Sequence, residues 1–355
     1  MLEKLNMNEQ DWTDPYKDLP TQPYSIICAG AGARNVQWPD GSITSCEEIK
    51  RDLNFDQLFA WNLEGKALLE WVEYLNTHPE CKCKLVVDSG AYSMWSRGKE
   101  FDMDEYINFL NSNNIIETAF WCAEADVIPG RMNVEPTAEE KAQAPEKSWQ
   151  NYLYMIDRVK CPKKIVPIFH MHEDFKHLKR MLSYKLKDGS FIEYIGISPA
   201  NDAHVNDKAK WYEQVWKLIY EECDKLGRNI PYTHNFGMTT ISLMEQYPSY
   251  TSDSTSWIRG ASFGNIMLVI NGKIKTVYVS DRNPHSPDHI NNQPLAVREA
   301  VEKMCAEIGH GLTLKNLTDD DSSGSLRMCF NIYALDKWRK SFKYEGNKSF
   351  KQDLW

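Results

Sequence analysis

The sequence predicts an α/β fold: a (β/α)8 barrel of the TIM type with a C-terminal extension made of a hairpin and helices. Short β-rich runs alternate with amphipathic stretches over most of the 355 residues. A repeated strand, helix, strand order implies parallel pairing through right-handed crossovers. The β-rich runs number eight when one strand expected between residues 31 and 66 is counted, which favours a closed barrel over a doubly wound open sheet.

The expected strands are β-branched or aromatic runs bounded by polar or small residues. Seven of them lie at residues 24–30, 84–88, 118–126, 164–170, 192–198, 230–237 and 249–253. The expected helices have apolar residues three or four positions apart. They lie at residues 103–113, 146–160, 173–182, 208–227 and 240–248. The first twenty residues show neither pattern and predict an irregular arm.

After the last barrel strand the pattern changes to a hairpin. Residues 266–280 are two β-rich runs around Asn271-Gly272, a dipeptide that favours a two-residue hairpin turn. A helix, a polar linker that predicts a mobile loop, and a docked helix with a basic face follow at 294–309, 317–325 and 329–344. We therefore expect two parts: a barrel with its arm at residues 1–265, and an extension packed on it at residues 266–355.

Composition and charge argue against several classes of protein. A net charge of −9 is unfavourable for coating nucleic acid nonspecifically, although it allows a local basic groove. No run approaches the ~20 apolar residues of a membrane span, and the first residues contain no apolar signal core. We expect no membrane partner and a cytoplasmic protein, in the host cytoplasm if a phage encodes it. Nine cysteines, an odd number, favour reduced thiols, with Cys28, Cys122 and Cys329 as small buried hydrophobes.

Polar or minimal groups stand at the ends of six successive expected strands. They are Asp88, Asp126, His170, Gly196 with Ser198, Asn235 with Gly237, and Asp253. In barrels of this class the functional site gathers at the carboxyl ends of the strands. Each residue alone has a structural alternative. Asp88 is equally well placed to cap the next helix, and Glu124 competes with Asp126 for the same side of one strand.

The patterns that suggest cofactors or metals are weak. The run GAGARN at 30–35 lacks the third glycine of a dinucleotide-binding turn. His170 and His172 have no clear third ligand, so a packed or base-contacting histidine is favoured over a metal site. A second set, His78, Cys81 and Cys83, precedes a strand and predicts an exposed turn. We therefore expect no metal and no cofactor.

Asp88 and Asp253 are predicted to face one another across the barrel mouth. Two carboxylates in different surroundings can divide nucleophilic and acid/base roles, as in retaining glycosyl transfer. The stretches DSGAY, at 88–92, and TSDSTSW, at 251–257, resemble motifs of the tRNA-guanine transglycosylases and of their relatives that insert 7-deazaguanines into DNA. The order and spacing of the motifs agree over residues 84–280, which is more than half of the chain.

The resemblance implies a base-binding set. Its members are Ser89, Tyr92, Asp126, His170, Gly196, Phe236 and Gly237. Asp126 is similar to the carboxylate that accepts hydrogen bonds from guanine N–H groups, and His170 stands where the family has a glutamine. Tyr92 and Phe236 are implied to stack on the two faces of the base, which contributes roughly 1–3 kcal/mol.

Two departures point to one branch of the family. Its tRNA enzymes carry a cysteine-rich zinc site after the hairpin, whereas residues 281–355 contain only Cys305 and Cys329. Their basic stretch after the nucleophile is reduced to SWIRGAS. The chain therefore resembles the phage and bacterial DNA-guanine transglycosylases most. The candidate phosphate contacts are Arg259, Arg97 and Lys99.

The resemblance implies an enzyme that exchanges bases. Asp253 would form a covalent glycosyl-enzyme as guanine leaves, and Asp88 would deprotonate an incoming base such as 7-cyano-7-deazaguanine. DNA is the expected polymer, and tRNA is the first alternative. A barrel glycoside hydrolase that uses Asp88 and Asp253, and a noncatalytic binding subunit, are the others.

Overall fold

The computed structural model describes residues 2–19, 25–200, 202–238, 240–247, 249–318 and 323–342. Its main sheet is parallel and has the strand order β7-β6-β5-β4-β1-β11-β10-β9-β8. β7 and β8 are two pieces of one run that Pro167 interrupts, since proline has no N–H to donate. The two ends of the sheet therefore meet at Pro167, and the predicted α/β barrel is confirmed.

The barrel strands are short and mostly buried. They are β1 (Ser25–Ala29), β4 (Gln57–Ala60), β5 (Leu85–Asp88), β6 (Trp121–Ala123), β7 (Ile165–Val166), β8 (Ile168–His170), β9 (Tyr194–Ser198), β10 (Tyr232–Asn235) and β11 (Thr251–Ser254). β4 is the strand that the sequence placed only between residues 31 and 66.

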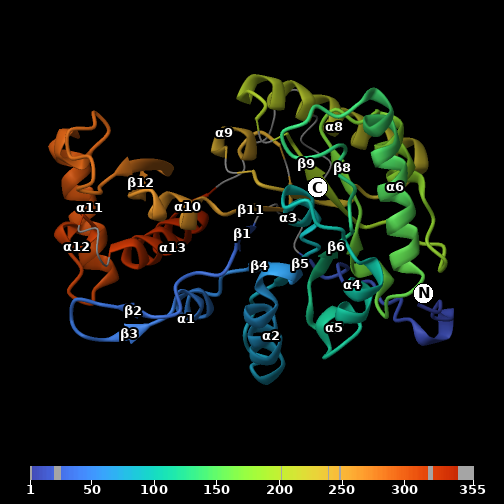
Figure 1. Ribbon diagram of the computed structural model, residues 1–355, viewed down its shortest axis with the longest axis horizontal. Coiled ribbons are helices and arrows are strands. Elements are labelled where there is room, and N and C mark those ends of the chain that lie inside the picture. Colours follow the sequence, from blue (N-terminus) through green and yellow to red (C-terminus); the bar gives the residue numbers. More distant parts are fainter. Residues whose placement is uncertain are drawn as a thin grey trace.

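Helices connect these strands and cover the outside of the barrel (Figure 1). They are α2 (Trp61–Thr77), α3 (Ala91–Ser96), α4 (Met103–Leu110), α5 (Ile115–Thr118), α6 (Ala138–Ile156), α7 (Phe175–Ser183), α8 (Val205–Leu226) and α9 (Ile241–Met244). α10 (Ser256–Ser262) follows β11, the last barrel strand, and packs on elements nearer the C-terminus. The described ranges also contain three 3-10 turns: η1 (Met7–Glu9) in the N-terminal arm, η2 (Pro162–Lys164) before β7, and η3 (Ile290–Asn292) in the C-terminal part of the chain. α6 begins earlier than its apolar spacing predicts, because Thr137 and Glu140 form a capping box.

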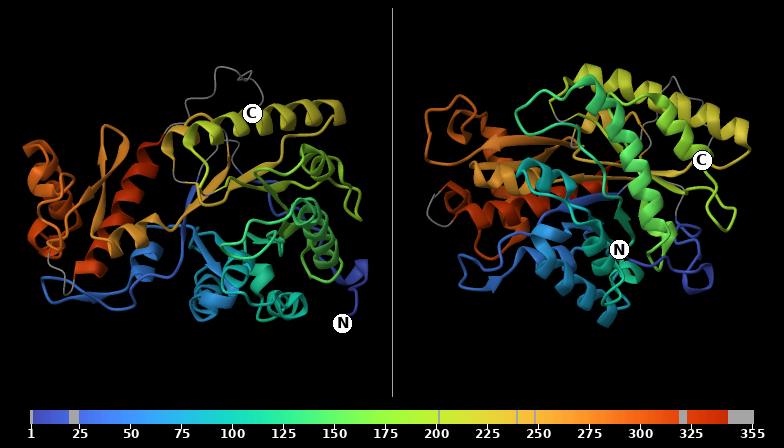
Figure 2. Two further views of the ribbon diagram at one scale, coloured as in Figure 1. Left: turned by 45° about the horizontal axis from the view of Figure 1, so that its top comes forward. Right: turned by 45° about the vertical axis from the view of Figure 1, so that its right-hand side comes forward.

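A second group of elements lies beside the barrel, as Figures 1 and 2 show. It contains β2 (Val36–Gln37), β3 (Ile43–Thr44), α1 (Cys46–Asp52), β12 (Asn265–Ile270), β13 (Lys273–Tyr278), α11 (Leu295–Ile308), α12 (Leu314–Thr318) and α13 (Ser323–Ser341). β12 and β13 form the predicted hairpin, and Asn271 and Gly272 both have positive φ, of 51° and 76°. This combination matches a type I′ turn.

The extension includes chain from both ends of the sequence. α1 packs against α13, where the Sγ atoms of Cys46 and Cys329 lie 3.9 Å apart. Arg339 of α13 donates to the backbone oxygens of Leu53 and Asn54, at 2.9 Å for Asn54. The segment that follows β1 therefore joins the C-terminal elements, which sequence order alone does not indicate.

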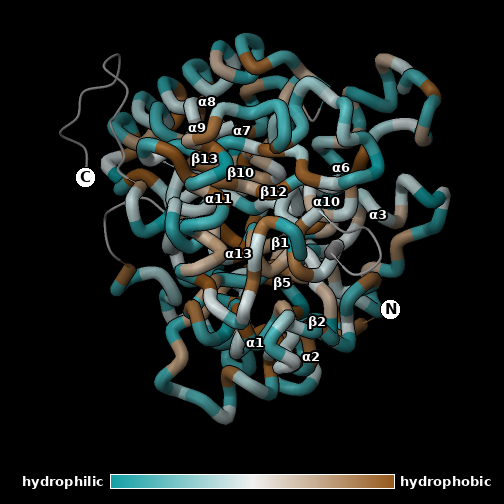
Figure 3. Tube along the Cα trace, turned by 90° about the vertical axis from the view of Figure 1, so that its left-hand side faces the viewer, coloured by the Kyte–Doolittle hydropathy of each residue, from teal (hydrophilic) through white to brown (hydrophobic). Residues whose placement is uncertain are grey.

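The linker and tail differ in part from their predictions. The tail helix α13 already begins at Ser323, inside the stretch 317–325 that predicts a loop, and residues 319–322 and 343–344 lie outside the described residues. In Figure 3 hydrophobic stretches lie towards the middle of the molecule and hydrophilic ones dominate its outline. None of the nine cysteines is in a disulfide. In the described ranges, no helix is long and apolar enough to cross a membrane.

The interior of the barrel is a core of its own, closed at one end by the N-terminal arm. Tyr16 of this arm is only 1% exposed, and its ring centroid lies 5.0 Å from that of Tyr194. Its hydroxyl donates to the backbone oxygen of Lys163 at 3.3 Å. Apart from η1, the described part of the arm, residues 2–19, is irregular as predicted, and Tyr16 fills the end of the barrel away from the carboxyl ends of the strands.

Candidate functional site

Side chains that point into the barrel alternate along each strand, and near the carboxyl ends they become polar. In β10 and β11 the inward positions carry His234, Thr251 and Asp253, which hydrogen bond to one another. Asp88 and His170 are the last residues of β5 and β8. The strand ends singled out by the sequence therefore do meet at one end of the barrel.

Three aspartates share this barrel mouth. Burial raises the pKa of Asp88 to about 7, and the nearby carboxylates of Asp126 and Asp253 add to the shift. The backbone N–H of Gly90 donates to Asp88 and opposes it. Asp88 is consequently a carboxyl group that can both give and take a proton near neutral pH.

The capping role considered for Asp88 is wrong. The N-cap residue of α3 is Gly90, which has the left-handed conformation with φ 68°. No side-chain hydrogen bond caps this helix. A Cβ at Gly90 would lie 2.2 Å from Oδ1 of Asn62, so this turn requires glycine. Ser89 is 1% exposed, and its hydroxyl accepts from the N–H of Ala91 at 3.3 Å. The base contact of Ser89 stays a prediction.

The structure separates Asp126 from its competitor Glu124. Glu124 is fully buried, and its Oε1 accepts from the N–H of Ile168 at 2.7 Å, beside the break at Pro167. Burial raises the pKa of Glu124 well above its usual range, which favours its neutral form. Asp126 lies at the mouth instead, as its effect on Asp88 shows.

Asp126 is paired with His170. Oδ2 of Asp126 lies 3.2 Å from Nε2 of His170, close enough for an ion pair but without the alignment of a hydrogen bond. Burial alone would lower the pKa of His170, but the carboxylates of Asp126 and Glu173 outweigh it and raise this pKa. His170 is therefore biased towards its protonated, donating form.

Asp253 has different surroundings from the other two aspartates. It is 8% exposed, and its Oδ1 accepts from the backbone N–H of Gly237 at 2.6 Å. Nε2 of His234 lies 3.3 Å from the same oxygen. Gly237 has φ 59°, a conformation that favours glycine and that directs its N–H towards the carboxylate. The predicted base-binding Gly237 thus holds the predicted nucleophile.

The two aromatic residues predicted to enclose a base lie in different surroundings. The ring of Phe236 covers Gly196, where a Cβ would meet Cε2 of Phe236 at 2.6 Å. Tyr92 is 53% exposed and contacts the ring of Trp95, with centroids 5.6 Å apart. Among the described residues no ring contact joins Tyr92 to Phe236. Tyr92 therefore belongs to the rim and Phe236 to the floor, and a sandwiched base stays a prediction.

The predicted phosphate contacts are all exposed. Arg97 follows α3 and Lys99 comes two residues later, on the Asp88 side of the mouth. Arg259 lies in α10, which directly follows β11 and Asp253. Their positions after these two strands leave them accessible to a polymer, and their contacts with phosphate stay predictions.

The sequence patterns for metals and dinucleotides have structural explanations. His78 stacks on Tyr74 with ring centroids 4.2 Å apart, and Cys83, unlike most of its turn, is buried. The described part of the chain holds no group of three His, Cys, Asp or Glu residues suited to a metal.

The glycine-containing turn after β1 uses its N–H groups within the protein. The N–H of Ala31 donates to Glu64 at 2.5 Å, and that of Gly32 donates to Glu47 at 3.0 Å. Because carboxylates already occupy these donors, the turn is not a cradle for phosphate.

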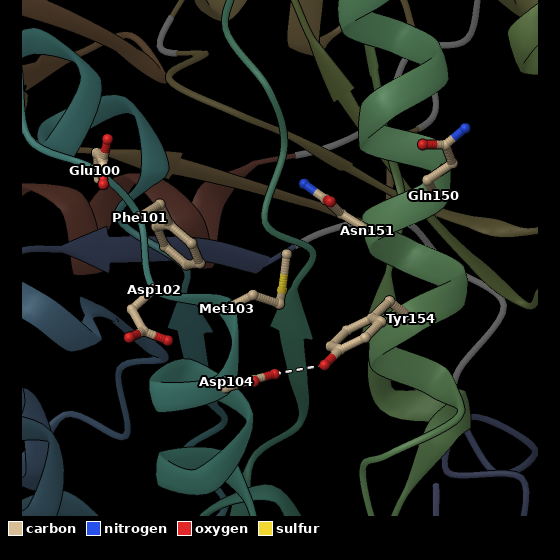
Figure 4. A pocket seen from close by; sticks show the side chains of 8 residues that line it. All are labelled: Glu100, Phe101, Asp102, Met103, Asp104, Gln150, Asn151 and Tyr154. Carbon is tan, nitrogen blue, oxygen red and sulfur yellow. Dashed lines mark hydrogen bonds between the residues drawn. The ribbon is translucent and has the colours of Figure 1, made fainter. Parts of the chain in front are cut away.

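A separate hollow of about 650 Å3 lies between α4 and α6 (Figure 4). Asp102 on its rim caps α4 through the N–H of Glu105 at 2.9 Å, and Asp104 accepts from the hydroxyl of Tyr154 at 2.6 Å. These acids have structural partners, whereas Asp88 has a strongly raised pKa. Because such groups concentrate at functional sites, the barrel mouth is the better candidate.

Sequence reasoning missed His234, Thr251 and Tyr194. His234 lies two residues before Phe236 and therefore on the same inward side of its strand, which is the signal that could have identified it. Fold and site together define an α/β barrel with an aspartate cluster at the carboxyl ends of its strands. A scan against protein-family models finds no match to the chain, and a search of curated proteins finds no relative.

Proposed function

We propose that the protein is a transglycosylase that replaces guanine in a polynucleotide, DNA by preference, with a 7-deazaguanine. The observation that carries the proposal is the contrast between two inward-facing aspartates. Asp88 has a pKa of about 7, while Asp253 has one oxygen held by donors. Carboxyl groups in contrasting surroundings are suited to acid/base and nucleophilic roles, respectively.

In the first step, Asp253 attacks the sugar carbon that carries guanine. The new bond joins that carbon to a carboxylate oxygen, and the electrons of the broken carbon–nitrogen bond go to guanine. Protonated Asp88 supplies the proton that the leaving ring nitrogen requires, and a pKa near 7 leaves such a proton available.

The second step reverses the first with a different base. The ring N–H of a 7-deazaguanine gives its proton to Asp88, and the nitrogen attacks the sugar carbon. The ester bond breaks and its electrons return to Asp253 as a carboxylate. Asp88 ends the cycle protonated, so atoms and charge balance without a metal or cofactor.

The pair of Asp126 and His170 fits recognition of guanine. A carboxylate accepts hydrogen bonds from the ring N–H and the amino group of guanine, which adenine does not offer in the same arrangement. Protonated His170, favoured by Asp126, can donate to the guanine carbonyl oxygen. The ring of Tyr92 on the rim provides a surface on which a base can stack, and such stacking does not depend on the identity of the base.

The polymer must present an unstacked nucleotide, because the glycosidic bond is inaccessible inside a duplex. Arg97, Lys99 and Arg259 are exposed beside the two aspartates and would contact the backbone. With a net charge of −9, such contacts have to be local. The proposed place of action is a cytoplasm, that of the host if a phage encodes the protein.

Incorporation of labelled guanine tests the proposal. The protein is incubated with labelled guanine and DNA or unmodified tRNA, and 7-cyano- and 7-aminomethyl-7-deazaguanine are supplied in parallel. We expect label in DNA, and none with Asp253→Asn. Label in tRNA alone would show that the polymer substrate is tRNA and not DNA. Release of guanine without uptake of a base would indicate a hydrolase, and no reaction with any base or polymer would overturn the proposal.

A further inference from the structure

We infer that His234 is a positioning residue: together with Thr251 and Tyr194 it orients Asp253 so that one carboxylate oxygen is held and the other is free to react. The role in catalysis rests on the proposed function. The hydrogen-bonded arrangement itself does not, and it can be tested separately.

The arrangement is a continuous chain of polar atoms inside the barrel. The hydroxyl of Tyr194 lies 2.6 Å from Oγ1 of Thr251, and that oxygen lies 2.8 Å from Nδ1 of His234. Nε2 of His234 lies 3.3 Å from Oδ1 of Asp253. The four side chains come from three adjacent strands, β9, β10 and β11. Both ring nitrogens of His234 are therefore engaged.

The direction of each hydrogen bond in this chain follows from the carboxylate of Asp253 at its end. A carboxylate can only accept, so Nε2 of His234 has to carry the hydrogen that faces Asp253. In a neutral imidazole Nδ1 then lacks a hydrogen and accepts from the hydroxyl of Thr251. Thr251 in turn accepts from Tyr194. The chain of donors thus runs from Tyr194 to Asp253 and selects one tautomer of His234.

The surroundings of His234 favour this neutral form. The residue is 0% exposed, with the ring of Trp121 at 4.7 Å and that of Phe236 at 4.5 Å between centroids. Burial lowers the pKa of His234, and the carboxylate of Asp253 opposes the shift without cancelling it. Asp253 is the charged group in direct contact with its imidazole.

The consequence is a division of labour between the two oxygens of Asp253. Oδ1 accepts from both His234 and the N–H of Gly237. Oδ2 accepts no hydrogen bond from any residue that the structure describes. We therefore assign Oδ2 as the atom that bonds to the sugar carbon. The donors on Oδ1 keep the carboxylate oriented during attack and stabilise it again when the ester breaks.

Removing one hydroxyl from this chain of hydrogen bonds tests the inference, and the neighbouring strand β10 provides a matched control. Thr251→Val removes the hydroxyl that selects the tautomer. Thr233→Val removes another buried hydroxyl. Thr233 is the residue before His234, and its Oγ1 has no hydrogen-bond partner among the described residues. We expect Thr251→Val to lower kcat for base exchange several-fold with KM for the free base unchanged, and Thr233→Val to change neither. Equal effects of the two substitutions would overturn the inference.

Substitution of His234 itself separates donation from packing. A hydrogen bond to a charged group contributes about 1.5–3 kcal/mol, so His234→Leu is expected to slow formation of the covalent adduct about 10- to 100-fold. His234→Gln retains an N–H donor and is expected to recover part of that rate. Equal rates for the Gln and Leu variants, both folded, would overturn the inference.

The tautomer can be observed without any substrate. Histidine-selective nitrogen-15 spectra of the full chain are expected to contain the signal of a neutral, Nε2-protonated imidazole at pH 7 that is missing from the spectrum of His234→Gln. This signal is thereby assigned to His234. An Nδ1-protonated or charged ring at this position would overturn the inference. If the wild-type protein forms no adduct but this signal is present, the proposed function fails while the arrangement around Asp253 stands.

Discussion

Asp253 and Asp88 lie in β11 and β5, which β4 and β1 separate in the sheet, and their surroundings differ. On the β10–β11 side, the N–H of Gly237 and the imidazole of His234 donate to one oxygen of Asp253. On the β5 side, burial and two neighbouring carboxylates raise the pKa of Asp88 to about 7, and one backbone N–H only partly offsets them. The comparison shows that donors and neighbouring charges, rather than residue type, distinguish a candidate nucleophile from a candidate proton carrier.

The largest expected effect comes from removing the nucleophile. Asp253→Asn has nearly the same shape and is expected to abolish the covalent adduct, with a loss of activity of at least about 10^4-fold. Gel electrophoresis under denaturing conditions measures the adduct, and thermal unfolding checks the fold. An adduct that survives the substitution would place the nucleophile elsewhere.

Asp88→Asn is expected to lower activity by about 10²- to 10⁴-fold, because the amide cannot transfer a proton. In the wild type the free protein must hold this proton, so kcat/KM for the polymer should fall as pH rises above about 7. The variant should lack this alkaline limb. A limb of unchanged position in Asp88→Asn would assign the titration to another group.

Stability should report the same titration independently of activity. The pKa of Asp88 is raised in the folded protein, so its contribution to the free energy of unfolding is fully present below the unfolded pKa near 4. It is lost as pH rises to about 7, by about 4 kcal/mol at most. Denaturant unfolding between pH 4 and 8 should therefore show a smaller loss for Asp88→Asn than for the wild type. Parallel curves would contradict the raised pKa.

Gly196→Ala should disturb the floor of the barrel mouth, where Phe236 covers Gly196. Its Cβ would lie 2.6 Å from Phe236 and 3.0 Å from Ile168, so the free energy of unfolding is expected to fall by about 1–3 kcal/mol. Gly65→Ala in α2 is the matched control, because nothing lies within 4 Å and alanine favours the helix. Denaturant unfolding measures both, and an equal result for both would show that Phe236 moves freely.

The smallest effect is expected at Glu124, a buried acid that lies outside the barrel mouth of Asp88 and Asp253. Burial favours the neutral form of Glu124, and glutamine is neutral and of nearly the same shape, so Glu124→Gln should change the free energy of unfolding by less than about 1 kcal/mol. Glu124→Ala leaves the N–H of Ile168 unpaired and should cost about 1–3 kcal/mol. A large loss of base exchange in a stable Glu124→Gln would instead give Glu124 a functional role.

Much of the fold could be predicted because its patterns are local. Alternation of strands and helices, the Asn271-Gly272 turn and the end of α8 near residue 227 depend on neighbouring residues. Polar residues at strand ends were informative for the site, since parallel strands bring their carboxyl ends together. The plug formed by Tyr16 and the contact of α1 with α13 depend on residues far apart in the chain, and no local pattern encodes them.

The sequence by itself determined the barrel and the strand ends that hold Asp88 and Asp253, whereas Asp126 lies beyond the end of β6 at Ala123. Only the tertiary structure decided which of Glu124 and Asp126 reaches the mouth, because the break at Pro167 needs a buried acceptor for an unpaired N–H. It also decided the surroundings of each aspartate. Burial and hydrogen bonds between strands set the protonation of a carboxyl group, and these exist only when the barrel has closed.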